Sequence, residues 1–481
     1  MPVQRRRLRS PDGLAVAFDA IRRELEVPVD FAPEALEEAA SVAASGGDGW
    51  PEVAGARRDA RALELRTLDP VGSTDLDQAM HLERAGDGYR VRYAIADVAA
   101  FVRPGGALDR AAHERVTTVY CPDTRVPLHP PEISEDAGSL LPDQDRPAVL
   151  WTFLLDAAGD VTEVGVERAT VRSRLRLDYA AEQARLDAGV DRDDPVALLA
   201  EIGTLRAALE RARGGVSLGL PEQEVTREDG TWRIVQRATL PLEDHNAQIS
   251  LMTGMAAARL MLDAGVGVLR TMPAAAPDAV AELRRVAVTL GVPWPDGASY
   301  GDVLAGLDRS LPATAAFLDA ATGLFRGAAW TPFDGAAPAE REHGAVGAPY
   351  AHVTAPLRRL VDRYGLEVCL AVHAGREVPA WVRDALPSLG EEMARGTQRA
   401  AAVDRACTDV MEAALLGPRV GDVLDGVAID DRTVRLEDPA VVARTTTRDL
   451  PVGERVAVRV VTADVASRRV ELERVTPSPA G

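Results

Sequence analysis

The chain has 481 residues, of which 46% are hydrophobic and 27% are charged, and its formal net charge is −19. These are the proportions of a globular protein that is long enough for several domains and a full hydrophobic core, so they exclude a disordered chain. No uninterrupted apolar run approaches the ~18 residues of a membrane span, so neither a membrane helix nor a secretory signal is expected.

The residue types that are missing exclude further classes of protein. All 55 basic residues are arginine, so enzymes that need an ε-amino group, such as Schiff-base enzymes, are excluded. The three cysteines, Cys121, Cys369 and Cys407, are far apart and form no C-x-x-C motif. This excludes a thiolate zinc site and predicts a reducing, cytoplasmic setting. The acidic charge repels polyanions, but it does not exclude a local groove lined by arginine.

Residues 1–50 are predicted to form a helical N-terminal segment, with one helix at 14–21 and another after Pro33. A linker with the sequence G-G-D-G follows at 44–51. From residue 61 the apolar pattern changes to a period of two, which predicts a strand, an acidic loop and then a hairpin with its turn at A-G-D-G.

Residues 51–416 are predicted to form one α+β domain of mixed sheet and helices. Its expected elements after the hairpin are a strand pair at 148–172 and helices within 178–213, 243–330 and 386–416.

Residues 417–476 return to about five short strands, which is the size of an OB-type barrel. Residues 419–474 contain 10 Arg against 11 Asp and Glu, so this unit is almost neutral in an acidic chain. It is interpreted as a platform for single-stranded nucleic acid, with a packing or dimerisation module as the alternative.

The acidic loop D-P-V-G-S-T-D-L-D-Q contains Asp69, Asp75 and Asp77. A carboxylate cluster of this kind is stabilised by a divalent cation, and oxygen ligands favour Mg²⁺ or Mn²⁺. Such a site supports the hydrolysis of a phosphate ester. Asp97 falls opposite this loop across the hairpin and is an accessory candidate, subject to strand register. The alternative is an ordinary solvated acidic turn.

Two further segments are candidates for contacts with phosphate or base. In Y-A-H-V-T-A-P-L-R-R-L-V-D-R a helix is expected to start at Pro356, which would place Arg358 and Arg359 in its first turns and pair Arg358 with Asp362. The alternative is a surface salt bridge. Tyr120 precedes a proline in an extended loop, where its ring suits base stacking, unless it is a core tyrosine.

Five segments in this order resemble the ribonuclease II family of RNB exoribonucleases. They are T-L-D-P-V-G-S-T-D-L-D-Q-A, Y-R-V-R-Y-A-I-A-D-V-A-A-F-V-R-P-G-G-A-L-D, T-T-V-Y-C-P-D-T-R-V-P-L-H-P, R-A-R-G-G-V-S-L-G-L-P-E and Y-A-H-V-T-A-P-L-R-R. The resemblance implies an RNB catalytic domain with a C-terminal S1 (OB-fold) domain. It also implies Mg²⁺-dependent 3′→5′ hydrolysis of single-stranded RNA to nucleoside 5′-monophosphates, without a nucleotide cofactor.

The resemblance assigns roles to individual residues. Asp69, Asp75 and Asp77 match the family's metal-binding aspartates, and Arg358 matches its catalytic arginine, which would stabilise charge on the scissile phosphate. Tyr120 matches its base-stacking tyrosine. Tyr179 falls near the position of another RNA-contacting tyrosine of the family. Arg359, next to Arg358, is a further candidate for RNA binding.

Three departures from the family pattern bear on function. Gln78 stands where the family has a fourth aspartate, and it is an accessory candidate because its amide can hold a metal-bound water, although it brings no charge. The positions Ala247 and Gln248 lack an expected pair of glutamates, and the N-terminal cold-shock domains are expected to be absent. The leading hypothesis is an active exoribonuclease. An RNA-binding protein of the same fold with weak or no nuclease activity is the alternative, and a phosphoesterase acting on a small substrate is a third class.

Overall fold

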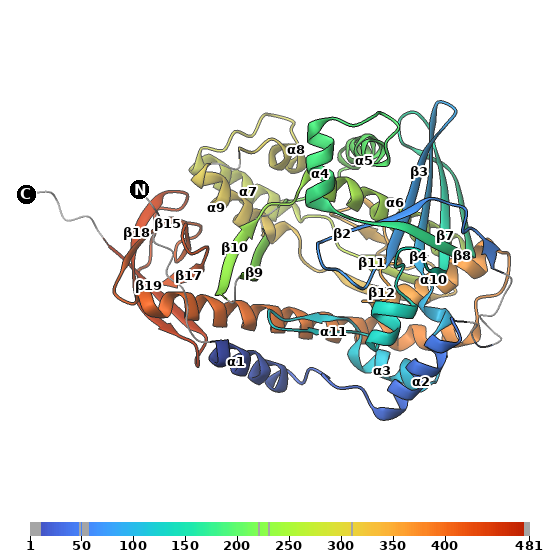
Figure 1. Ribbon diagram of the computed structural model, residues 1–481. Helices are drawn as coiled ribbons and strands as arrows, with labels where there is room; N and C mark the ends of the chain where they lie inside the picture. The colour runs from blue at the N-terminus through green and yellow to red at the C-terminus, as the bar shows by residue number, and fades with distance from the viewer. Residues whose placement is uncertain are drawn as a thin grey trace, which may run out of the picture.

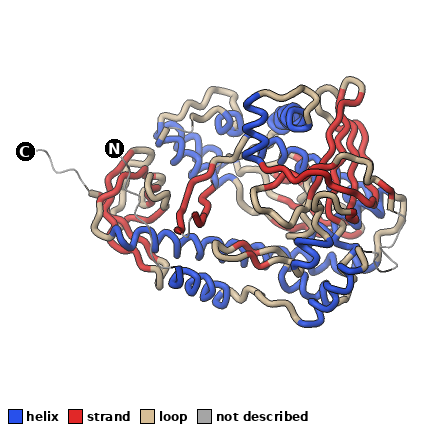
Figure 2. Tube along the Cα trace, in the orientation of Figure 1, coloured by secondary structure: helices blue, strands red, loops and turns tan. Residues whose placement is uncertain are grey.

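The computed structural model of the protein describes residues 11–47, 50, 57–219, 222–228, 231–308 and 311–475. A mixed sheet surrounded by helices forms one end of the molecule and a small barrel forms the other, with the long helix α11 (Ala380–Leu416) running between them (Figure 1). Figure 2 shows that helices cover the sheet while strands build the barrel. The predicted α+β class with an all-β C-terminal unit is confirmed.

The central sheet has six strands in the order β1-β8-β2-β3-β4-β7, and β8 also pairs with β7, so that the sheet curls back on itself. Its strands are β1 (Arg58–Asp59), β2 (Leu65–Asp69), β3 (Gln78–Ala85), β4 (Gly88–Ala96), β7 (Asp145–Leu155) and β8 (Val161–Asp178). β2 and β8 run parallel, whereas β3 is antiparallel to both β2 and β4. The carboxyl ends of β2 and β8 therefore lie side by side.

The predicted hairpin of β3 and β4 is confirmed. Ala85 pairs with Gly88 across a two-residue turn, in which Gly86 has a φ of 59° that favours glycine. The alternation along β4 places Tyr93 in the core with 0% exposure, whereas Arg92 faces the other way and pairs with Glu83 at 2.7 Å.

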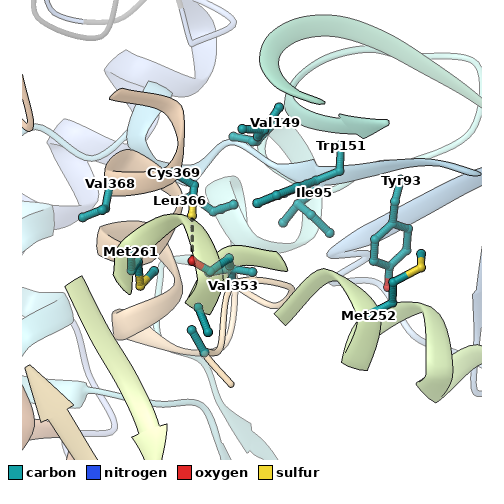
Figure 3. Close-up of a cluster of buried hydrophobic side chains, with 14 of the residues drawn as sticks. Tyr93, Ile95, Val149, Trp151, Met252, Met261, Val353, Leu366, Val368 and Cys369 are labelled. Atoms are coloured by element: carbon teal, nitrogen blue, oxygen red, sulfur yellow. Dashed lines mark hydrogen bonds between the residues drawn. The ribbon is translucent and has the colours of Figure 1, made fainter. Parts of the chain in front are cut away.

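The main core lies between the sheet and two helices, α6 (Pro241–Ala264) and α10 (Leu360–His373). Figure 3 shows Tyr93 of β4 and Trp151 of β7 in the same cluster as Met252 of α6 and Leu366 of α10. Trp151 is fully buried. Burying a large apolar side chain contributes roughly 1.5–3 kcal/mol. This cluster therefore holds α6 and α10 against the sheet.

The helices α1 (Pro11–Glu24) and α2 (Pro33–Ala44) agree with those predicted near the N-terminus. Residues 48, 49 and 51 of the predicted linker at 44–51 lie outside the described residues. The division of the chain into 1–50, 51–416 and 417–476 stays a prediction. The remaining helices of five or more residues are α3 (Ala107–Arg115), the π-helical turn Glu132–Ala137, α4 (Tyr179–Ala188), α5 (Pro195–Ala212), α7 (Pro277–Leu290), α8 (Tyr300–Ala305) and α9 (Pro312–Ala321).

Several short strand pairs were not predicted. They are β5 (Val119–Tyr120) with β6 (Arg125–Val126), β9 (Glu222–Glu228) with β10 (Thr231–Arg237), β11 (Val266–Thr271) with β12 (Ala329–Asp334), and β13 (Glu342–His343) with β14 (Ala348–Pro349). β11 lies within the region predicted to be helical. A short apolar run such as V-G-V-L-R-T has no periodicity that separates strand from helix, and its partner strand is distant in the sequence.

The C-terminal strands form a closed barrel in the order β15-β16-β17-β19-β18, as predicted. Their bounds are β15 (Val423–Ala428), β16 (Thr433–Leu436), β17 (Val442–Thr445), β18 (Arg455–Asp464) and β19 (Arg469–Arg474). Apolar side chains such as Val434, Val458 and Leu472 fill its interior with 0% exposure. None of the helices in the described part of the chain is long and apolar enough to cross a membrane.

Candidate active site

Asp69 and Tyr179 lie together at the carboxyl ends of two parallel strands. Asp69 ends β2 and is in register with Asp178, which ends β8. Tyr179 follows at once as the first residue of α4. Burial, and then the charge of Asp69, raise the pKa of Tyr179 to about 12. Its hydroxyl oxygen accepts a hydrogen bond from Nδ2 of Asn246 at 2.7 Å. Parallel pairing thus brings together two candidates that are far apart in the sequence.

Asp77 and Arg358 meet in the same region. The Asp77 residue is only 4% exposed. Its Oδ1 accepts a hydrogen bond from the backbone N–H of Leu357 at 2.8 Å, and its Oδ2 accepts one from Nε of Arg358 at 3.3 Å. Burial raises the pKa of Asp77 to about 7, although Arg358 and the Leu357 N–H act in the opposite direction. The local donors therefore do not offset the cost of burying this charge, a cost that a cation relieves.

Asp69 has the same need for positive charge. Its buried Oδ2 has no hydrogen-bond partner. Burial, opposed by Arg358 and assisted by Asp75, raises the pKa of Asp69 to about 6. A buried carboxylate oxygen without a partner is costly unless a cation or a water molecule meets it. Asp69 and Asp77 together therefore fit an ion that prefers oxygen ligands, such as Mg²⁺ or Mn²⁺.

Asp75 has a different partner in the structure. The guanidinium of Arg125, on β6, forms ion pairs with both Asp75 and Glu135. Among the residues that the structure describes, no three His, Cys, Asp or Glu side chains are placed to hold a metal ion. Joint metal binding by Asp69, Asp75 and Asp77 therefore stays a prediction. It requires the ion pair between Asp75 and Arg125 to break, so that Asp75 can bind the ion.

Arg125 is a site residue that the sequence analysis missed. Its alternation with the buried Val126 marks the polar face of a short strand. No feature of the sequence, however, indicates which acid that face meets.

The structure corrects the predicted start of the helix at Pro356. α10 begins at Leu360, and Arg359 before it is extended, with φ −137° and ψ 126°. The chain between forms a turn that is held from outside, because Thr118 N–H donates to the carbonyl oxygen of Arg358 at 3.0 Å. This pairing places Arg358 next to the segment that leads into β5. It holds the chain out of the helix that Pro356 would otherwise start.

The predicted pair of Arg358 with Asp362 is also wrong. Asp362 accepts from Nε of Arg359 at 2.9 Å and from Nη2 of Arg359 at 2.7 Å. The side chain of Arg358 is 43% exposed beside Asp77, whereas that of Arg359 is 21% exposed. Arg358 therefore faces the acids, while Arg359 already has a carboxylate partner. The proposed contact of Arg359 with RNA stays a prediction.

Gln78, at the start of β3, engages neutral partners instead of the acids. Its Nε2 donates to the carbonyl oxygen of Thr354 at 2.6 Å, and its Oε1 accepts hydrogen bonds from the hydroxyls of Tyr93 and Ser250. These contacts occupy both the nitrogen and the oxygen of its amide, and an accessory role for Gln78 at a metal stays a prediction. Its amide connects β3 and β4 to α6 and to the loop that carries Arg358.

Asp97, the other accessory candidate, also has partners outside the acidic loop. It is 1% exposed, and its Oδ2 accepts hydrogen bonds from Nη1 of Arg57 at 2.8 Å and from Nε of Arg168 at 3.0 Å. Although burial acts to raise it, the charges of Arg168 and Arg57 hold the pKa of Asp97 below its usual value. Arg168 also pairs with Glu367 of α10. This buried ion network occupies the carboxylate, and an accessory role for Asp97 stays a prediction.

Tyr120 lies on β5, beside the acids and open to solvent. It is 54% exposed, so it is not a core tyrosine. Its partly buried surroundings, and then the charge of Asp75, raise the pKa of its hydroxyl. Tyr120 pairs in register with Arg125, which connects it to Asp75. Four separate segments thus meet at one place: the loop 69–78, the hairpin of β5 and β6, the start of α4 and the turn before α10.

Comparisons with known protein families agree with this architecture. The model of the RNB domain matches residues 57–368, and the model of the RNase II-type exonuclease C-terminal S1 domain matches residues 422–475. The second range contains the whole closed barrel.

The curated relatives include Ribonuclease R of Escherichia coli, which is 28% identical over 443 residues, 86% of this chain and 53% of that protein. The Exosome complex exonuclease RRP44 of Homo sapiens is 30% identical over 197 residues, 40% of this chain and 21% of that protein. The chain thus spans about half the length of the ribonuclease R that it matches.

Two solved structures share the fold. The Mycoplasma genitalium RNase R in complex with ribose methylated single-stranded RNA has a TM-score of 0.83 and 18% identity, covering 96% of this chain and 78% of that one. Yeast Ssd1, a pseudonuclease, has a TM-score of 0.68 and 15% identity, covering 96% of this chain and 58% of that one. The RNB match covers more than half of the sequence. The chain therefore belongs to the RNB family and has an RNase II-type S1 domain after its RNB domain.

Proposed function

We propose that this protein is a divalent-metal-dependent exoribonuclease that degrades single-stranded RNA from 3′ to 5′ and releases nucleoside 5′-monophosphates. Its membership of the RNB family and its similarity to ribonuclease R support this class of activity. The observation that carries the proposal is the buried Asp77 carboxylate, which accepts hydrogen bonds from the Leu357 N–H and from Arg358. The charge of Arg358 also acts on Asp69, whose buried Oδ2 has no hydrogen-bond partner. Ligands for a cation and a guanidinium for phosphate thus occur together.

Each acid and Arg358 has a role in this proposal. Asp69, Asp75 and Asp77 would hold Mg²⁺ or Mn²⁺, which supplies an activated water and neutralises charge on the phosphate oxygens when it is bound. Arg358 would donate to a phosphate oxygen as negative charge develops there. Asp77 receives the hydrogen bond from Nε of Arg358 and so orients the guanidinium. The two terminal nitrogens of Arg358 make no hydrogen bond within the described part of the chain, so they are available to a phosphate.

Contacts with RNA away from the phosphate would come from aromatic rings and the barrel. The exposed ring of Tyr120 suits stacking on a base, and Tyr179 lies close enough to Asp69 for that charge to act on its hydroxyl. The barrel β15–β19 is an OB-type platform for a single strand. Because the three cysteines are free, the proposal includes a reducing cytoplasmic location. It requires neither a nucleotide cofactor nor a membrane.

An RNA-binding protein with weak or no nuclease activity is the second candidate, and two observations favour it. Gln78 adds no charge to the acidic cluster, and Asp75 is ion-paired with Arg125. The fold alone does not decide between the two, since the solved structures that share it include both a ribonuclease R and a pseudonuclease.

The deciding experiment uses a 5′-labelled single-stranded RNA with Mg²⁺ and the purified protein. We expect progressive shortening from the 3′ end and nucleoside 5′-monophosphates as products, and no digestion when a chelator removes the metal. An RNA that is blocked at its 3′ end is the matched substrate control. Tight binding without any product would support the RNA-binding alternative. Hydrolysis of small phosphodiesters but not of RNA would instead support a phosphoesterase that acts on a small substrate.

A further inference from the structure

Two cysteines meet beside the strand that carries Tyr120. Cys121 opens the turn between β5 and β6, where its N–H donates to the carbonyl oxygen of Thr124 at 2.9 Å. Cys407 lies on α11 and is 2% exposed, and both side chains belong to one apolar cluster. Contacts between α11 and β5 bring the two side chains together in this cluster, and each thiol affects the acidity of the other. Both cysteines are free and Cys121 is partly exposed, so the structure contains a dithiol that small oxidants can reach.

Arg22, on α1, completes this cluster. Its guanidinium contacts the Cys121 thiol. It also forms a two-pronged ion pair with Asp123, with Nη1–Oδ1 at 2.7 Å and Nη2–Oδ2 at 3.1 Å. Arg22 is only 8% exposed, and Figure 1 shows α1 lying along α11. A buried guanidinium that touches a thiol stabilises the thiolate, which is the reactive form.

The two thiols differ in acidity. The hydrogen bond from Cys407, and then the one from Arg22, lower the pKa of Cys121 to about 7. Donation to Cys121, and then burial, raise the pKa of Cys407. Cys121, which is partly exposed and lies beside the buried Arg22, is therefore the better-placed nucleophile, and the buried Cys407 is placed to resolve. One nucleophilic and one resolving cysteine form the usual arrangement of a redox-sensing pair.

We propose that Cys121 and Cys407 form a redox-active pair that a hydroperoxide converts into a disulfide, and that this bond restrains the hairpin carrying Tyr120. The Cys121 sulfur attacks the hydroperoxide, so that an S–O bond forms, the O–O bond breaks and water or an alcohol leaves. The Cys407 thiol then attacks the sulfenic sulfur, the S–S bond forms, and hydroxide leaves as water with the Cys407 proton. Two thiols are oxidised by two electrons and one peroxide is reduced.

The disulfide would act on the candidate active site through the hairpin. A disulfide bond is about 2.05 Å long, which is shorter than a contact between unbonded sulfurs, so its formation draws Cys121 toward α11. Tyr120 is the adjacent residue, and its partner Arg125 is ion-paired with Asp75. This second part of the inference rests on the proposed function, because its readout is the digestion of RNA.

The disulfide itself is tested without RNA. Reduced, folded protein is treated with hydrogen peroxide, denatured, alkylated and digested. We expect a cross-linked peptide that joins Cys121 to Cys407, a loss of two of the three alkylatable thiols, and reversal by dithiothreitol. Cys369 is the internal control, because it is 0% exposed and lies near the carbonyl oxygen of Ala257. Absence of the cross-linked peptide, or equal oxidation of Cys369, would overturn the proposal.

Two variants separate chemistry from folding. In Cys407→Ser the resolving thiol is missing, so Cys121 should accumulate as a sulfenic acid that a cyclic dione labels. In Arg22→Gln the positive charge is missing, so oxidation of Cys121 should slow several-fold, because the thiolate is the attacking form. Peroxide-dependent labelling that is equal in reduced wild type and Cys407→Ser would show that Cys407 is not the resolving thiol and would overturn the pair.

The effect on the candidate active site is tested with a 5′-labelled RNA. We expect the oxidised protein to stop at a different limit product from the reduced protein, and peroxide-treated Cys407→Ser to keep the reduced pattern. A cross-link that forms without changing the limit product would overturn the coupling to the hairpin. A reduced protein that digests no RNA would instead refute the proposed function, while the cross-linking result would stand independently.

Discussion

Asp77 and Arg358 are 281 positions apart in the sequence, and Oδ2 of Asp77 accepts a hydrogen bond from Nε of Arg358 at 3.3 Å. The backbone N–H of the adjacent Leu357 binds the other oxygen of the same carboxylate at 2.8 Å. One buried acid therefore holds both the side chain and the backbone of the turn before α10.

Asp77→Asn should abolish nearly all hydrolysis while RNA affinity stays within a few-fold. The amide oxygen can still accept the Leu357 N–H, so the turn is retained, but the negative charge for a metal is lost. A loss of several kcal/mol of transition-state stabilisation, at ~1.4 kcal/mol per tenfold, corresponds to about a thousandfold or more in rate. Single-turnover digestion and a binding titration measure the two effects. Asp296→Asn, at an exposed position, is the control, and near-normal turnover in Asp77→Asn would remove the proposed site.

Arg358→Ala should lower kcat with a modest effect on RNA affinity, and Arg358→Lys should rescue it poorly. A guanidinium can bond to Asp77 and to phosphate oxygens at once, whereas an ammonium acts as a point charge. The measurement is kcat and KM on one RNA for both variants. If Ala weakens binding and leaves kcat unchanged, Arg358 is a docking residue.

Gln78→Asp should lower stability and should not reduce the requirement for Mg²⁺. The shorter carboxylate has no N–H to donate to the buried carbonyl of Thr354, and it adds negative charge near Asp69 and Asp77. Leaving a buried polar group unpaired costs about 1–3 kcal/mol. A metal titration at fixed RNA and a thermal unfolding curve test this. A lower Mg²⁺ requirement with a faster rate would show that a fourth carboxylate completes the site.

Tyr120→Ala should change the length at which digestion stops, with little effect on the cleavage of long RNA. Stacking on a base contributes ~1–3 kcal/mol, which matters most when a short RNA makes few other contacts. Denaturing gels of the end products measure the change. Tyr120→Phe is the control, because it keeps the ring and should retain the wild-type limit product. An unchanged limit product in a folded Tyr120→Ala protein would argue against stacking.

Glu412→Gln should stabilise the protein above neutral pH. Burial raises the pKa of Glu412 to about 7, against 4.5 as its ordinary value, so the folded state holds its proton more tightly and stability falls as pH rises between these values. Glutamine keeps the Oε1 acceptor for Gln223 Nε2 at 2.9 Å and for the N–H of Val442 in the barrel at 3.1 Å.

The difference in the free energy of unfolding for Glu412→Gln at about pH 8 should reach up to about 3 kcal/mol, at 1.36 kcal/mol per pKa unit. At about pH 4 the two proteins should be nearly equal. Denaturant unfolding at both pH values measures this, with Glu377→Gln at an exposed position as the control. A decrease of stability with pH that persists in Glu412→Gln would assign that decrease to other groups.

Much of the fold and the set of candidate residues could be predicted from the sequence. The period-two pattern of residues 89–95 and the turn A-G-D-G determine the β3–β4 hairpin, because they are local properties of the chain. The short strands after residue 417 predict the barrel for the same reason. The order of the five segments from Asp69 to Arg358 identifies the family without any knowledge of distances.

Only the tertiary structure decides which partner each candidate side chain takes. Gln78 and Asp97 lie near the acidic loop in sequence or register, yet one bonds to Thr354 and the other to Arg57 and Arg168. Arg125, which no motif marks, is paired with Asp75. These contacts join residues from separate strands and helices, so they depend on packing and on the direction of each side chain, which local periodicity does not encode.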